Sequence, residues 1–201
     1  MKKNKLLVTG VAGYIGSTFT YEALKKGYEV VGVDNFCNSD DAIIDYFLKN
    51  HPDQLEFIEL DLQNKAKLNS VLRRHKNIDC VLHFAALKSI SESEEKFDLY
   101  WNNNVEGTKS LLEAIEINGI KNIIFSSSAA IYGEQETQPI NEEAQTKPVS
   151  NYALTKLESE KHIKNYASNR IINAISLRYF NPVASHEDYV IYEDYTKSNN
   201  L

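Results

Sequence analysis

Two residues near position 150 have the types and the spacing of a proton-transfer pair. Tyr152 and Lys156 lie in the segment YALTK, four positions apart. If this segment is helical, the two side chains project from one face, one turn apart. A phenol has an ordinary pKa of ~10, and a neighbouring cation favours its ionised form, so the pair could transfer a proton. The competing interpretation is two polar residues on the solvent-exposed side of a helix.

A glycine-rich segment near the N-terminus indicates a cofactor on which such a pair could act. Gly10, Gly13 and Gly16 lie in TGVAGYIGS, directly after the apolar run KLLVTG and before a segment with helical spacing. Glycine permits a tight turn and a close approach of the backbone to a pyrophosphate, which the N–H groups of a helix N-terminus bind. This context favours a dinucleotide-binding turn over a merely tight one.

Two acids at the ends of later apolar runs extend this interpretation. Asp34 ends the second run, where its carboxylate would accept hydrogen bonds from the adenosine ribose and repel a 2′-phosphate. NAD is therefore favoured over NADP. Asp61 follows the third run and could accept from the adenine amino group or cap the N-terminus of the next helix. Both alternatives remain open.

The elements that must position these residues alternate along the chain. Short apolar runs predict strands over 5–10, 28–33, 55–60, 79–86, 122–127 and 173–180. Helical spacing between them predicts helices over 14–26, 41–50, 64–76, 98–118 and 150–168. The runs are apolar nearly throughout, as in strands buried on both faces. We therefore expect an α/β fold, a Rossmann-type doubly wound parallel sheet with helices on both faces.

Composition excludes several other classes of protein. The 201 residues are 42% hydrophobic and 25% charged, which is usual for a globular domain. The net charge of −6 and the lack of a basic cluster argue against a nucleic-acid partner. No apolar run approaches the ~18 residues of a membrane span. Cys37 and Cys80 fit a reducing, cytoplasmic compartment. The histidines lack metal-ligand spacing, and we interpret His83 as a core residue.

The chain resembles the extended short-chain dehydrogenase/reductases and, within them, the UDP-glucose 4-epimerases. The resemblance rests on VTGVAGYIGS, VDNFCNS, HFAALKSISES, NNNVEGT, FSSSAAIYGE, YALTKLESE and LRYFNPV. The glycine turn and the Tyr-Lys spacing mark only the superfamily, whereas DNFCNS, FAALKSI and LRYFNPV are specific to the epimerase branch. The resemblance implies NAD as cofactor, a UDP-sugar as substrate, and interconversion of UDP-glucose and UDP-galactose through a 4-keto intermediate.

The resemblance also implies roles for individual residues. The catalytic residues would be Tyr152, Lys156 and Ser128. The residues against the cofactor would be Gly10, Gly13, Tyr14, Ile15, Gly16, Asp34, Asn35, Asn38, Ser39, Asp61, Leu62, Phe84, Ala85, Ala86, Lys88, Asn103, Ser128, Tyr152, Lys156 and Phe180. The residues against the UDP-sugar would be Lys88, Ser128, Tyr152, Asn181 and Asn200.

Several features separate this chain from relatives. Ala129 and Ala130 follow Ser128, where sugar-nucleotide 4,6-dehydratases carry an acid pair, so elimination of water is disfavoured. Family members continue well beyond Leu201, so we expect an NAD-binding domain over 1–183 and the start of a substrate-binding region over 184–201. The alternatives to an active UDP-glucose 4-epimerase are an NAD-binding remnant without turnover, and an epimerase of UDP-N-acetylhexosamines or UDP-uronic acids.

Two expectations concern assembly. Apolar stripes on the helices over 98–118 and 150–168 favour a homodimer, with coverage of the protein's own sheet as the alternative. The stripes contain Leu111, Leu112, Ile115, Leu154, Leu157 and Ile163. A last strand without a partner would leave a sheet edge prone to aggregation.

Overall fold

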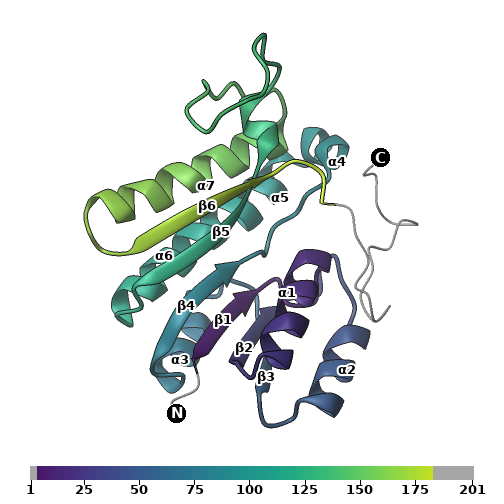
Figure 1. The fold of residues 1–201 in the computed structure, drawn as a ribbon, viewed down its shortest axis with the longest axis vertical. Coiled ribbons are helices and arrows are strands. Elements are labelled where there is room, and N and C mark those ends of the chain that lie inside the picture. The colour runs from purple at the N-terminus through teal and green to yellow at the C-terminus, as the bar shows by residue number, and fades with distance from the viewer. Residues whose placement is uncertain (1–3, 183–201) are drawn as a thin grey trace.

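A computed structural model describes residues 4–182, which form one six-stranded sheet covered by helices (Figure 1). All strand pairs are parallel, and their order across the sheet is β3-β2-β1-β4-β5-β6. This order, with crossovers running outward in both directions from β1, is that of a dinucleotide-binding Rossmann fold. The strands are β1 (Lys5–Thr9), β2 (Glu29–Asp34), β3 (Leu55–Glu59), β4 (Ile78–His83), β5 (Asn122–Ser128) and β6 (Asn173–Tyr179).

Helices occupy both faces of the sheet (Figure 1). Two of them, α1 (Tyr14–Lys25) and α2 (Ala42–Asn50), cover one face. The opposite face is covered by α3 (Lys65–Arg74), α6 (Gly107–Ile117) and α7 (Asn151–Ser168). Shorter segments complete the order: α4 (Ile90–Glu95), α5 (Phe97–Tyr100), the π-helical η1 (Trp101–Glu106) and the 3-10 helix η2 (Ala129–Tyr132).

Alternate residues of the central strand supply two separate cores. Leu6 and Val8 of β1 pack with α1 and α2, whereas Leu7 between them packs with α3, α6 and α7. A strand places successive side chains on opposite faces, so an uninterrupted apolar run fills both cores. The predicted α/β fold class and sheet are therefore confirmed.

The turn after β1 has no space for side chains at two of its glycines. Gly10 has a φ of +72°, and a Cβ there would lie 2.6 Å from the backbone nitrogen of Ala85. A Cβ on Gly16 would collide with the carbonyl oxygen of Gly10. Only glycine therefore allows this loop to pass so close to both α1 and the segment after β4.

Two predicted elements differ from those observed. The helix expected over 98–118 is divided into α5, η1 and α6. Its π-helical turn contains buried Asn104, whose amide nitrogen donates to the carbonyl of Leu87 and the hydroxyl of Thr155, both at 3.0 Å. The strand expected over 79–86 ends at His83 because the chain turns there toward the loop that passes Gly10.

The last strand also departs from expectation. A strand buried on both faces was predicted over 173–180, but Ile175 of β6 is 57% exposed and Leu177 is 39% exposed. Both side chains lie on the sheet face that carries α1 and α2. These two helices cover the far side of the sheet and do not extend over β6. None of the helices within residues 4–182 combines the length and the apolar character that a membrane span requires.

Candidate active site

A cavity of about 1610 Å³ opens at the carboxyl ends of the strands. Every residue predicted for the site within 4–182 lines it, although these residues come from segments spread over nearly the whole described chain. They are Gly10, Gly13, Tyr14, Ile15, Gly16, Asp34, Asn35, Asn38, Ser39, Asp61, Leu62, Phe84, Ala85, Ala86, Lys88, Asn103, Ser128, Tyr152, Lys156, Phe180 and Asn181. Asn200 and the expected region over 184–201 lie outside the described residues.

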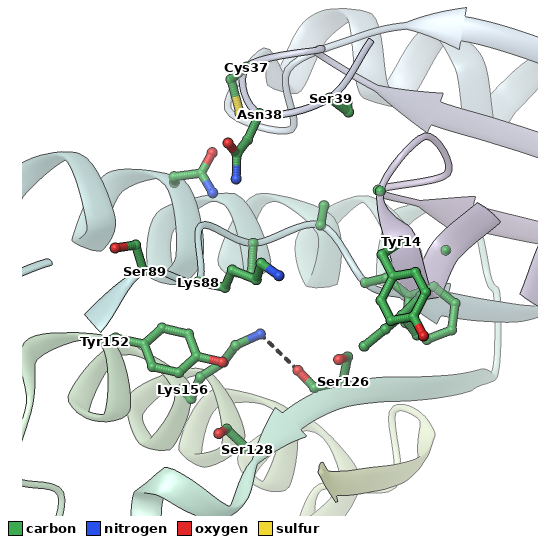
Figure 2. Close-up of a pocket in the computed structure, with 18 of the residues that line it drawn as sticks. Tyr14, Cys37, Asn38, Ser39, Lys88, Ser89, Ser126, Ser128, Tyr152 and Lys156 are labelled. Carbon is green, nitrogen blue, oxygen red and sulfur yellow. Dashed lines mark hydrogen bonds between the residues drawn. The ribbon is translucent and has the colours of Figure 1, made fainter. Parts of the chain in front are cut away.

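The predicted catalytic residues lie together on one wall of this cavity (Figure 2). Ser128 ends β5, and α7 presents Tyr152 in its first turn and Lys156 one turn later. The Lys156 Nζ atom donates to the carbonyl of Ser126 at 2.8 Å and lies 6.0 Å from the centre of the Tyr152 ring. Lys88 projects into the space between this wall and Asn38 (Figure 2). The Tyr-Lys pair therefore faces a cavity rather than bulk solvent.

Burial controls the ionisation of both groups. It lowers the pKa of the Lys156 ammonium from 10.5 to about 7, and the charge of Glu160 partly opposes this shift. Burial raises the pKa of the Tyr152 phenol, while a hydrogen bond with Ser128 lowers it. Desolvation of the phenol therefore outweighs the hydrogen bond from Ser128, and the expectation that Lys156 favours the phenolate stays a prediction.

Asp34 holds together the opposite end of the cavity. One carboxylate oxygen accepts from the backbone nitrogen of Ala12 in the glycine turn at 3.0 Å. The other accepts from the backbone nitrogen of Phe36 at 3.0 Å and from the Ser39 hydroxyl at 3.2 Å. Asp34 therefore joins the loops after β1 and β2, and its predicted contact with a ribose stays a prediction.

One alternative for Asp61 is wrong. The N-cap of α3 is Asn64, whose side chain accepts from the backbone nitrogen of Lys67. Asp61 instead accepts from the backbone nitrogen of Gln63 at 2.8 Å and from the Asn35 amide at 3.2 Å. The helix begins too late for Asp61 to reach its first turn, so the adenine-facing role is the remaining interpretation.

His83 is the core residue that the sequence predicted. Its ring nitrogens bond the hydroxyls of Thr9 at 2.7 Å and Thr108 at 2.9 Å. Complete burial, reinforced by the charge of Lys156, lowers its pKa to about 3. Thr108 donates its own proton to the carbonyl of Asn104, so its oxygen accepts from His83 Nε2. The lowered pKa keeps the ring neutral.

An arginine that the sequence did not single out connects elements that carry residues of the site. Arg178 in β6 makes a two-point ion pair with Glu160 of α7, with distances of 3.0 and 2.8 Å. It also donates to the Tyr132 hydroxyl at 2.7 Å and to the carbonyl of Glu142 at 2.9 Å. One guanidinium thereby ties α7, which carries Tyr152, to the segment that follows Ser128.

The short helix α4 and the residues just before it form a part of the cavity wall that sequence reasoning missed. Ser89, Ile90 and Glu92 line the cavity. The Ser89 side chain caps α4 by accepting from the backbone nitrogen of Glu92 at 3.2 Å. The spacing Ser-x-x-Glu is a signal for such a helix start, but a helix of only six residues has no apolar periodicity to accompany it.

Two further features limit the chemistry of the site. Ala129 and Ala130 line the cavity directly after Ser128, so no carboxylate extends from these positions. Among residues 4–182, no group of three or more histidine, cysteine or acidic side chains could hold a metal ion.

The sheet order and the glycine turn define a Rossmann-type protein. The Tyr-Lys pair beside the carboxyl end of β5 places it in the short-chain dehydrogenase/reductase class. Within this class, the chain belongs to the NAD dependent epimerase/dehydratase family, whose model matches residues 6–194.

Individual members of this family that are similar to the chain are 4-epimerases of UDP-sugars. UDP-glucose 4-epimerase 2 of Arabidopsis thaliana is 41% identical over 193 residues, which cover 94% of this chain and 55% of that protein. The structure of UDP-glucose 4-epimerase from Bifidobacterium longum in complex with NAD+ and UDP has a TM-score of 0.89 at 36% identity, covering 95% of this chain and 57% of that one. UDP-N-acetylglucosamine 4-epimerase from Methanobrevibacter ruminantium M1 has a TM-score of 0.81 at 34% identity, covering 92% and 57%. The chain therefore spans little more than half the length of these relatives.

Proposed function

We propose that this protein is an NAD-dependent epimerase that interconverts UDP-glucose and UDP-galactose by inverting C4. The observation that carries the proposal is the convergence of Ser128, Tyr152 and Lys156 on one cavity with the glycine turn and Asp34. Family membership and the similarity to UDP-glucose 4-epimerases support the same reaction.

The cavity has features that fit a dinucleotide. Within the described residues, no side chain caps the N-terminus of α1, and its first turn contains no acid. An anionic pyrophosphate suits such a helix end. We infer that the pyrophosphate lies against Tyr14 and Ile15 and that the adenosine lies beside Asp34 and Asp61. The proposed contacts of the rest of the cofactor, toward its nicotinamide end, are Phe84, Ala85, Ala86, Lys88, Asn103 and Phe180.

When bound, the nicotinamide supplies a reversible two-electron acceptor for the C4 carbon. Tyr152 takes the proton of the 4-hydroxyl as that carbon is oxidised, and returns it after the 4-keto sugar has presented its other face. Ser128 hydrogen-bonds the 4-oxygen throughout. Because burial raises the pKa of the phenol, ionisation of Tyr152 would need a neighbouring cation, which protonated Lys156 or, when NAD is bound, the oxidised nicotinamide ring would supply.

Experiments can test the alternatives to this proposed function, which are another UDP-sugar substrate or the absence of turnover. The similarity to a UDP-N-acetylglucosamine 4-epimerase favours, as the second candidate, the same reaction on a UDP-N-acetylhexosamine. A UDP-uronic acid is the other substrate class to compare. An NAD-binding remnant without turnover would retain the cavity and the contacts of the glycine turn, but would release no product.

We also propose the setting in which the protein works. Cys37 and Cys80 are both free thiols, which supports a reducing, cytoplasmic location. The net charge of −6 supports the absence of a nucleic-acid partner.

A homodimer through α5, α6 and α7 is a further proposal. Leu111, Leu112, Ile115 and Ile163 are buried in the protein's own core and cannot form an interface. The proposal therefore rests on Leu154 and Leu157, which are partly exposed, and on Phe97 and Leu99, which are 37% and 48% exposed.

The decisive experiment measures turnover and cofactor binding in parallel. We expect the protein to convert UDP-galactose to UDP-glucose with NAD, and Tyr152→Phe to lower kcat by at least ~100-fold while NAD still binds. Tyr166→Phe, on the same helix but outside the cavity, is the matched control and should keep its activity. NAD binding without conversion of any UDP-sugar would instead support the remnant. UDP-N-acetylgalactosamine and UDP-glucuronate, assayed in parallel, identify the preferred substrate.

A further inference from the structure

The first turn of α7, which carries Tyr152, is held from outside its own helix. The first backbone N–H groups of a helix have no partner within it and need external acceptors. Ser150, the local N-cap, accepts from the backbone nitrogen of Ala153 at 3.1 Å. The other two acceptors come from α4: Glu94 accepts from the nitrogen of Asn151 at 2.8 Å, and Ser93 accepts from that of Tyr152 at 3.0 Å.

The Ser93 hydroxyl is completely buried and has a defined direction. It donates to the carbonyl of Ile90 at 2.6 Å, which leaves its lone pairs for the Tyr152 N–H. The Asn151 side chain reinforces the contact, because its amide donates to the Ser93 carbonyl at 3.2 Å and to the Glu94 carboxylate at 3.1 Å. Water cannot easily replace an acceptor at such a buried position.

The same short segment forms part of the cavity wall. Lys88 and Ser89 line the cavity immediately before α4, and Glu92 lines it from within the helix. The buried Tyr100 hydroxyl donates to Glu92 at 2.9 Å and so fixes α4 to α5. The part of the cavity wall formed by α4 and the backbone of Tyr152 thus belong to one hydrogen-bonded unit.

We propose that Ser93 is a positioning residue that sets the place of the Tyr152 phenol relative to Ser128 and the sugar. This inference rests on the proposed function. Tyr152 is the second residue of α7, and the end of a helix frays readily when its N–H groups lack partners. A displacement of about 1 Å in a reacting group can cost about 100-fold in rate.

Ser93→Ala tests the proposal against two matched variants. Ser150→Ala removes the other serine acceptor at the same helix end without touching α4. Ser159→Ala removes an equally buried hydroxyl farther along α7. We expect Ser93→Ala to lower kcat at least ~10-fold more than either control, with KM for UDP-galactose and the Kd for NAD within about twofold of wild type.

A second measurement does not depend on turnover. With ring-labelled tyrosine, the NMR signal of Tyr152, assigned by its loss in Tyr152→Phe, should shift or broaden more in Ser93→Ala than in Ser150→Ala, and should stay unchanged in Ser159→Ala. If the wild-type protein turns over no UDP-sugar, the proposed function fails, and this signal alone decides the role of Ser93. If Ser93→Ala does not fold, Ser93→Cys, which is a weak acceptor of similar size, takes its place. Equal effects of all three substitutions on kcat and on the Tyr152 signal would overturn the inference.

Discussion

At the residue scale, the buried ammonium of Lys156 is a feature of the site that lowers the stability of the fold. The residue is 3% exposed, and its ammonium lies 5.0 Å from the centre of the Phe125 ring and donates a hydrogen bond to the backbone carbonyl of Ser126. Burial lowers its pKa from 10.5 to about 7. Between these pH values the unfolded chain binds a proton that the folded protein does not, so this lysine makes the free energy of unfolding rise with pH.

Replacing Lys156 should remove this dependence. We expect Lys156→Met to be more stable relative to wild type at pH 6 than at pH 9.5. The difference between the two proteins in free energy of unfolding should change by up to ~3 kcal/mol over this range. Urea denaturation of the cofactor-free protein at several pH values measures the difference. Lys161→Met, at an exposed position on the same helix, is the control. A difference that does not vary with pH would show that the buried ammonium is not destabilised in the fold.

At the scale of elements, the ion pair between Arg178 and Glu160 decides how β6, α7 and η2 fit together. The side chains are 23% and 10% exposed, so both charges are largely withdrawn from water. Desolvation offsets much of the attraction within such a pair, but removal of one partner leaves an uncompensated charge. The Tyr132 ring, with its centre 5.0 Å from the guanidinium carbon, adds a cation-π contact.

The two charges should therefore be strongly coupled. We expect Arg178→Met to lower the free energy of unfolding by ~3 kcal/mol, because Glu160 stays buried without its partner. The double variant Arg178→Met/Glu160→Met should be less destabilised than the single one, as denaturant titration would measure. A double variant at least as unstable as Arg178→Met would mean that packing and the bond to Tyr132, rather than charge balance, determine the effect.

At the scale of the whole molecule, the protein has an apolar sheet face and strand edge at β6. Within residues 4–182, no strand pairs with the outer side of β6. Ile175 and Leu177 are 57% and 39% exposed there. An exposed apolar edge strand is a template for pairing with other chains. The surface of α5 and α7 proposed for the homodimer is a separate one.

Light scattering during size-exclusion chromatography should distinguish these two surfaces. We expect Ile175→Lys to reduce concentration-dependent growth of large species, because a charge on the edge opposes strand pairing. Leu99→Lys should instead convert a dimer of defined mass into monomer. Large species that persist in Ile175→Lys would locate the association elsewhere, and a wild-type monomer at all concentrations would contradict both expectations.

The success of sequence reasoning differed between residues for physical reasons. Each of four site residues lies at or next to the end of a recognisable element: Gly10, Asp34, Ser128 and Tyr152. Parallel strands bring such positions together at the carboxyl end of the sheet. Ser93 and Arg178 have no such local signal. Their partners lie 59 and 18 positions away in sequence, and a serine or an arginine in an amphipathic segment resembles any surface residue.

The sequence by itself thus determined the local features of this protein. These are the period of the apolar runs, the glycines that a tight turn demands, and the spacing of Tyr152 and Lys156 on one helix. The tertiary structure alone decided the electrostatics. The pKa values of Lys156 and His83 depend on burial by segments remote in sequence, and the capping of α7 depends on α4. Desolvation and long-range hydrogen bonds are properties of packed neighbours, which no single stretch of residues contains.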